Sequence, residues 1–108
     1  MDDANLQVLM GLIINSGNSK NSSMEAIEAA KQGDFDTAKN KIIEAGEALS
    51  HAHKSQTSLL TAEAQGNNMQ VTLLTIHAQD HLMNAITFKD LAAEIVDLYC
   101  RRALFTIH

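Results

Sequence analysis

Two histidines and an aspartate that could do chemistry lie close together in the run His77-Ala78-Gln79-Asp80-His81. Because His77 and His81 are four residues apart, a helix would project them from one side, within reach of each other or of a shared ligand. A neutral imidazole fixed at one ring nitrogen by a hydrogen bond keeps a lone pair on the other, and that nitrogen is a usable nucleophile. This run is therefore the candidate reactive site.

The same residues also permit interpretations without catalysis. Two histidines at this spacing beside a carboxylate are able to bind zinc or another divalent ion. A histidine on a partly apolar helix is more often a hydrogen-bonded core residue than a ligand, and we assign His51 and His53 to that structural class. Asp80 is harder to dismiss, because a buried carboxylate is costly unless it is paired, protonated or bound to a cation.

The composition predicts an all-α fold. The 108 residues contain no proline and only five glycines, and these are the residues that most often interrupt helices. Gly33-Asp34 and Gly66-Asn67-Asn68 each supply a helix-ending glycine, and Asp34 adds an N-cap for the helix that follows. We therefore expect one domain over residues 1–108, an antiparallel three-helix bundle with helices at about 3–32, 34–65 and 69–103.

Charge, cysteine content and hydropathy exclude several classes of function. Eight basic against 13 acidic residues give a net charge of −5, and no basic cluster exceeds Arg101-Arg102, so nucleic acid is not an expected partner. The single cysteine, Cys100, excludes an internal disulfide, which suits a reducing cytoplasm. The apolar run Leu9–Ile14 is too short for a bilayer span and lacks a basic flank, so we expect neither a signal peptide nor membrane insertion.

Apolar spacing distinguishes the first two expected helices. Residues 3–32 carry a weak seam that the small, polar stretch Asn15–Ser23 interrupts. That stretch fits either a loop or a continuing helix whose small side chains let another surface approach closely. Residues 34–65 carry one regular seam in steps of three and four: Phe35, Ala38, Ile42, Ala45, Leu49, Ala52, Gln56 and Leu59.

The third expected helix carries two stripes about 100° apart. The Asp80 stripe consists of Leu73, Ile76, Asp80, Met83, Thr87, Leu91, Glu94 and Leu98. The His81 stripe consists of Val71, Leu74, Ala78, His81, Ala85, Phe88, Ala92, Ile95 and Tyr99. Two apolar stripes predict that this helix is buried on two sides, whereas a monomeric three-helix bundle buries only one side of a helix. The pattern therefore predicts self-association, with the polar members of the Asp80 stripe near a symmetry axis.

Helical angles also place the remaining side chains near the candidate site. His77 falls between the two stripes, so we expect it to be partly sheltered. Leu82 and Ile86 fall on the outer side of the helix, about 200° and 240° from Asp80, where we expect them to form an apolar rim for a docking partner.

Three segments together resemble a known family. The run His77–Met83, with Met10–Gly17 and Gln32–Phe35, is closely similar to the lactose/cellobiose-type enzyme IIA of the bacterial phosphoenolpyruvate-dependent sugar phosphotransferase system. Met10–Gly17 looks closer to the cellobiose/chitobiose branch than to the lactose branch. The chain departs from the family at Tyr99–His108, which is more apolar than the family's short, charged ends and leaves the end of the third helix open.

The resemblance implies a fold, an activity and partners. Members are homotrimers of three-helix protomers that relay a phosphoryl group from phospho-HPr to a cysteine of the cognate IIB component. It implies that His77 accepts and donates the phosphoryl group, that His81 is a supporting neighbour, and that Asp80 is the metal ligand. Three symmetry-related carboxylates form an all-oxygen cluster, which favours one Mg²⁺ per trimer at the axis.

We therefore expect a cytoplasmic phosphocarrier for uptake of a β-linked disaccharide of the cellobiose, chitobiose or lactose type. The alternative is a non-catalytic helical oligomerisation module that binds a divalent metal through His77, Asp80 and His81, or one in which the polar stripe only fixes register.

Overall fold

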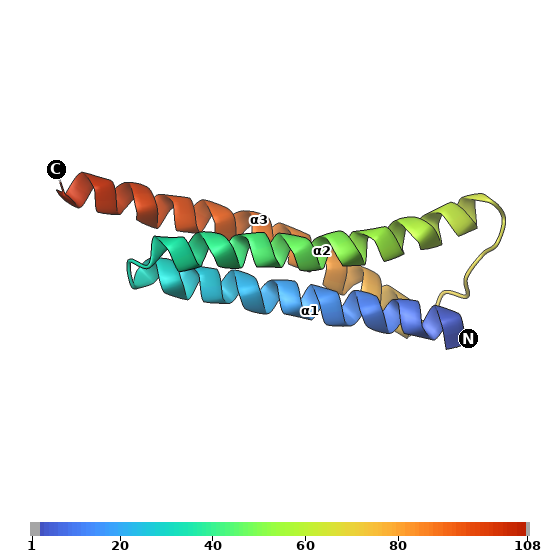
Figure 1. The fold of residues 1–108 in the computed structure, drawn as a ribbon. Helices are drawn as coiled ribbons and strands as arrows, with labels where there is room; N and C mark the ends of the chain where they lie inside the picture. Colours follow the sequence, from blue (N-terminus) through green and yellow to red (C-terminus); the bar gives the residue numbers. More distant parts are fainter. Residues whose placement is uncertain (1–2, 108) are drawn as a thin grey trace.

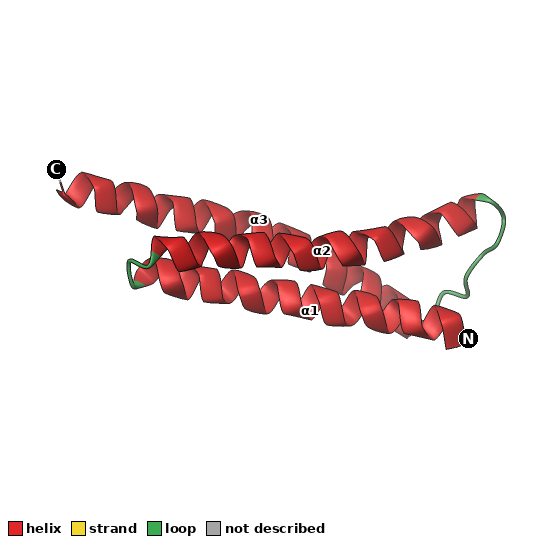
Figure 2. Cartoon of the chain, viewed as in Figure 1, coloured by secondary structure: helices red, strands yellow, loops and turns green. Residues whose placement is uncertain are grey.

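Three long helices make up almost all of the computed structural model, which describes residues 3–107, with side chains from residue 4 to residue 105. They are α1 (Asp3–Lys31), α2 (Phe35–Ala64) and α3 (Leu73–Ile107), arranged up, down and up (Figure 1). Among the described residues there is no strand (Figure 2). The bundle is elongated, at 60 × 21 × 19 Å. The predicted all-α three-helix architecture is confirmed.

The turn between α1 and α2 has the predicted capping chemistry. Gly33 takes a φ of +81°, and the Asp34 amide donates to the Ala29 carbonyl at 2.9 Å, as in a helix end that closes on a left-handed glycine. The Asp34 carboxylate then accepts a hydrogen bond from the Thr37 amide at 3.2 Å. One residue pair therefore ends α1 and begins α2, which forces the two helices to run antiparallel.

The third helix differs from the prediction at both ends. It begins at Leu73 and not at residue 69, because Thr72 caps it: the Thr72 hydroxyl accepts from the Thr75 amide at 3.2 Å and its carbonyl from the Ile76 amide at 3.0 Å. It continues to Ile107 and not to 103, since no proline or glycine follows Gly66. The end of α3 projects past the α1–α2 turn (Figure 1).

The core follows the seam of α2. Its members from Ala38 to Gln56 are buried, as the spacing predicts, except that Ile42 is only partly buried. Two clusters form around them. The larger, at the end that carries the histidine run, contains Leu9, Leu12, Leu49, Ala52, Ala78, Leu82 and Ala85. The smaller, near the α1–α2 turn, contains Ala26, Ala30, Ala38 and Val96.

The expected docking rim of Leu82 and Ile86 is wrong. Leu82 is fully buried and Ile86 packs against the same cluster. The core line of α3 runs through Ala78, Leu82 and Ala85, which lies nearly opposite Asp80 and not about 100° from it. The two alanines leave room for α1 and α2 to approach, and the Leu82 side chain fills the space between them.

The polar middle of α1 is helix, so the loop alternative is wrong. Ser16, Ser19 and Ser23 are fully buried, and their hydroxyl oxygens find no hydrogen-bond partner in the part of the chain that the structure describes. Their small side chains let the neighbouring helices approach α1 closely, which explains why a polar stretch is compatible with a packed interior. The hydroxyls themselves gain nothing in this position, since a buried polar group without a partner is destabilising.

We therefore expect Ser19→Ala to stabilise the protein, although most core substitutions destabilise. Removing the unpartnered hydroxyl and gaining helix propensity should raise the free energy of unfolding by about 1 kcal/mol. Ser58→Ala is the matched control, because Ser58 lies on α2 but is exposed, so only the propensity gain applies there. Urea denaturation of both variants checks this, and a Ser19→Ala protein no more stable than the control contradicts it.

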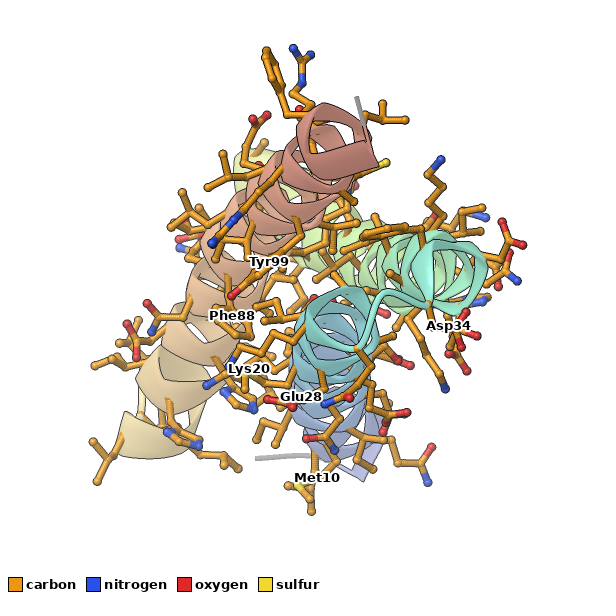
Figure 3. The ribbon with its side chains drawn as sticks, turned by 90° about the vertical axis from the view of Figure 1, so that its left-hand side faces the viewer. Met10, Lys20, Glu28, Asp34, Phe88 and Tyr99 are labelled. Atoms are coloured by element: carbon orange, nitrogen blue, oxygen red, sulfur yellow. The ribbon has the colours of Figure 1, made fainter. Side chains whose placement is uncertain are left out.

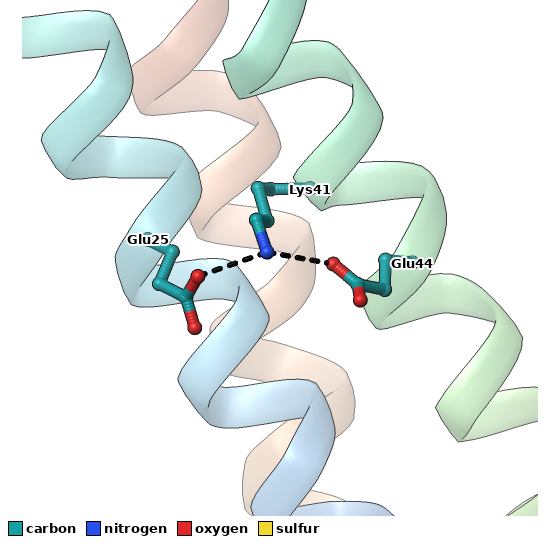
Figure 4. Close-up of polar contacts among 3 residues, drawn as sticks. All are labelled: Glu25, Lys41 and Glu44. Atoms are coloured by element: carbon teal, nitrogen blue, oxygen red, sulfur yellow. Dashed lines mark ion pairs between the residues drawn. The ribbon is translucent and has the colours of Figure 1, made fainter.

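A surface ion-pair network joins α1 to α2. The Lys41 ammonium lies 2.9 Å from a Glu25 carboxylate oxygen on α1 and 3.1 Å from one of Glu44 on α2 (Figure 4). Hydrogen bonds to Glu25 and then Glu44 raise the pKa of Lys41. Solvent screens these exposed charges, so the network adds more to the register of the helices than to their stability.

Candidate functional site

The histidine pair lies on α3, one turn apart. The His77 and His81 rings stack with centroids 5.7 Å apart and an angle of 12° between their planes, as the four-residue spacing predicts. His81 is half-buried, but His77 is exposed and opens onto a hollow of about 410 Å³ lined by Leu73 and Leu74. Within one chain, the expected shelter of His77 is therefore absent, and its ring is accessible to a large partner.

The neighbouring helix α1 gives His81 its partial burial. A Cβ placed on Gly17 would lie 3.8 Å from the His81 Nε2 atom, so α1 passes directly beside that ring. Burial is the main cause that lowers the pKa of His81, and the positive charge of Lys20 and the His77 ring lower it further. Asp80 acts in the opposite direction. His81 is thereby held in its neutral form to lower pH than an ordinary histidine.

We expect His81 to titrate below the ordinary histidine value of 6.5. Because its pKa is lowered in the folded state, the unfolded chain binds more protons as the pH falls below 6.5, so this group makes the fold less stable towards acid. Lys20→Gln should move the His81 titration upwards, since it removes one of the causes. Histidine C–H chemical shifts measured between pH 4 and 8 check both statements. A His81 midpoint at or above 6.5 contradicts them.

Asp80 lies on the outer face of α3. It is exposed, and its Oδ2 atom accepts a hydrogen bond from the Asn84 Nδ2 atom at 3.2 Å. The apolar members of the Asp80 stripe are exposed with it: Leu73 (82%), Ile76, Met83, Leu91 and Leu98 (65%). The expectation that α3 is buried on two sides is therefore not met within one chain, because α1 and α2 cover only the side opposite this stripe.

Helix α2 contacts the motif through two glutamines that the sequence analysis did not single out as a pair. The buried Gln56 Nε2 atom donates to the Gln79 Oε1 atom at 2.6 Å and lies 3.9 Å from the Met83 sulfur. A glutamine on an otherwise apolar seam was the available signal, since a buried amide needs a polar partner. The pair fixes the rotation of α3 against α2, and so the direction in which the histidines and Asp80 project.

The structure corrects or limits two other expectations. His51 and His53 are exposed and are not core residues. Among the residues that the structure describes, no three His, Cys, Asp or Glu side chains are placed to hold a metal ion. His77, Asp80 and His81 therefore do not form a metal site within one chain: the two histidine rings stack on each other, whereas the Asp80 carboxylate accepts a hydrogen bond from Asn84.

Fold and site together define a helical bundle that presents an exposed histidine at its surface. A carrier that receives a group from one macromolecule and gives it to another requires such an arrangement. The chain belongs to the family described as "PTS system, Lactose/Cellobiose specific IIA subunit", which matches residues 7–100. It is thus a phosphotransferase component of a sugar phosphotransferase system, of the cellobiose/chitobiose type.

Individual relatives agree with this assignment. The chain is 50% identical over 99 residues to the lichenan-specific phosphotransferase enzyme IIA component of Bacillus subtilis (strain 168), covering 92% of this chain and 90% of that protein. The crystal structure of the cellobiose-specific enzyme IIA from Bacillus anthracis superimposes with a TM-score of 0.91 at 47% identity, covering 96% and 94% of the two chains. The IIA(chitobiose) component in the Escherichia coli IIA(chitobiose)–HPr complex superimposes with a TM-score of 0.80 at 37% identity, covering 95% and 99%.

Proposed function

We propose that His77 is the residue that carries the phosphoryl group between HPr and the cognate IIB component. The observation that supports this most directly is the exposure of His77 beside its stacked, half-buried neighbour His81. A ring nitrogen of His77 attacks phosphorus as the bond to the donor breaks, and a cysteine thiolate of IIB then attacks the same phosphorus as the bond to His77 breaks. The HPr complex of the Escherichia coli chitobiose relative supports HPr as the donor.

His81 has a supporting role in this proposal. Its ring lies against His77 on one side and α1 on the other, so its position is fixed by packing. A neutral His81 offers a ring N–H to a phosphoryl oxygen held on His77, which orients the group without competing for it. His77 itself stays open to solvent and can meet two different proteins in turn, as a relay requires.

A homotrimer around the Asp80 stripe completes the proposal. The stripe leaves five large apolar side chains exposed along one face of α3, and such a patch marks an interaction surface. Threefold symmetry brings three Asp80 carboxylates together, and their oxygens are the donors that magnesium prefers. Asp80 would therefore hold one Mg²⁺ per trimer at the axis, where the ion supplies positive charge that offsets the carboxylates. A single chain cannot supply this donor set.

The cellular setting follows from the same relay. The carrier works in the cytoplasm in this proposal, and the lone Cys100 is compatible with that reducing compartment. No helix in the described part of the chain is long and apolar enough to cross a membrane. The transported sugar is a β-linked disaccharide of the cellobiose, chitobiose or lactose type, as in the relatives.

Phosphorylation in a reconstituted relay tests this function. We expect the protein mixed with phosphoenolpyruvate, enzyme I and HPr to acquire one acid-labile, base-stable phosphate per chain, and to lose it when the cognate IIB component is added. Omission of HPr should prevent labelling. A protein that binds Mg²⁺ and forms a trimer, yet takes no phosphate from phospho-HPr, would leave the metal-binding oligomerisation module as the function.

A further inference from the structure

Lys20 lies on the side of α1 that faces the histidine pair. It follows Gly17 by three residues, so both project from the same side of the helix, and the Cβ position of Gly17 is 3.8 Å from the His81 Nε2 atom. Figure 3 shows Lys20 in the space between α1 and α3. Side chains of a helix lean towards its N-terminus, which directs the lysine back towards Gly17 and the His81 ring.

The charge of Lys20 is not neutralised by an ion pair with any carboxylate that the structure describes. Lys31, Lys41 and Lys89 each form an ion pair with a glutamate or aspartate. Among the described residues, no such pair is formed by Lys20, although it is partly buried. Its field instead acts on the histidine pair, where it opposes a positive charge on His81. A partly buried cation beside the two imidazole rings is placed to interact with an anion that arrives there.

We propose that Lys20 is the phosphoryl-binding residue of the site, which rests on the proposed function of His77. A phosphoryl group on a His77 ring nitrogen brings negative charge to α3 one turn from His81, the ring that α1 passes beside. The Lys20 ammonium provides the compensating charge from α1, while α3 provides the histidines. No proton moves in this step. Lys20 stabilises the phosphoryl group while the P–N bond to the donor breaks and the bond to His77 forms, and again when the group leaves.

Rapid-quench kinetics with phospho-HPr and wild type, Lys20→Gln, Lys20→Arg and Lys39→Gln test this role. Lys39→Gln is the matched control, because it removes the same charge from an exposed lysine of α2 that forms no ion pair within the described residues. Lys39 lies beside Val96 and Asp97, which are far along α3 from His77. We expect Lys20→Gln to lower the transfer rate at saturating phospho-HPr by about tenfold and to shorten the lifetime of the phosphorylated protein. Lys20→Arg should restore most of both, because it keeps the charge.

Several outcomes would overturn the role of Lys20. Equal maximal rates for wild type and Lys20→Gln exclude it. A loss confined to KM and shared by Lys39→Gln shows only long-range attraction between the proteins. Failure of Lys20→Arg to restore the rate shows that packing, and not charge, matters. The wild-type reaction is the separate check on the proposed function, which fails if wild type takes no phosphate. If wild type is labelled and Lys20→Gln is labelled equally fast, only the role of Lys20 is wrong.

Discussion

Replacing His77 by glutamine is expected to abolish phosphoryl acceptance while the fold stays intact. Glutamine has no ring nitrogen that can form a P–N bond, so no phosphoprotein should be detected at any concentration of phospho-HPr. The His77 ring is exposed and belongs to neither core cluster, so the free energy of unfolding should change by no more than about 0.5 kcal/mol. Phosphate labelling and urea denaturation measure the two effects separately.

Two other histidine variants make this result specific. His51→Gln removes an exposed histidine of α2 and should be labelled like wild type. His81→Gln should still be labelled, but more slowly or with a shorter-lived phosphate, because it alters the ring that stacks on His77 and leaves the acceptor in place. Normal labelling of His77→Gln would exclude His77 as the acceptor. If His81→Gln lost all labelling at the same time, the acceptor role would pass to His81.

The sequence was sufficient for those parts of the fold that local chemistry decides. Gly33 and Asp34 end one helix and begin the next with backbone and side-chain bonds to residues within five positions, so their types alone predict the turn. Thr72 does the same for α3, but it was missed because a threonine before an apolar run is common in both loops and caps. The α2 seam was predictable because steps of three and four residues place all its members on one side of the helix.

What depends on packing between helices could not be predicted in the same way. The position of Leu82 in the core depends on where α1 and α2 lie around α3, and the spacing of α3 alone fits several directions. The contact of Gln56 with Gln79 joins residues 23 apart, and no local pattern contains it. The proximity of Gly17 to His81 likewise joins residues on two different helices, so no local pattern predicts it. The spacing of His77 and His81 did predict that the two rings lie within reach of each other, since both are on one helix.

Magnesium removal is expected to weaken the trimer at neutral pH, because the proposed axis brings three Asp80 carboxylates together. Two charges about 4 Å apart repel by about 4 kcal/mol at an effective dielectric constant of about 20, so three close carboxylates face about 12 kcal/mol. That is comparable to the stability of a whole domain. A single chain does not face this cost, since its Asp80 is exposed and hydrogen-bonded to Asn84. Sedimentation equilibrium with and without chelator measures the effect.

The variant Asp80→Leu should behave in the opposite way and remain a trimer in chelator. Leucine removes the repulsion and extends the apolar surface that Ile76 and Met83 already present on either side, so burial replaces ion binding as the stabilising contribution. The substitution leaves the His77 ring and its stacked neighbour His81 in place, so this variant should still accept a phosphoryl group. Asp90→Leu, at an exposed carboxylate elsewhere on the helix, should remain as sensitive to chelator as wild type. If the wild-type trimer is indifferent to chelator at pH 7, or if Asp80→Leu sediments as an 11.8 kDa monomer, Asp80 does not lie at a metal-binding axis, and the exposed stripe of α3 must contact a different partner.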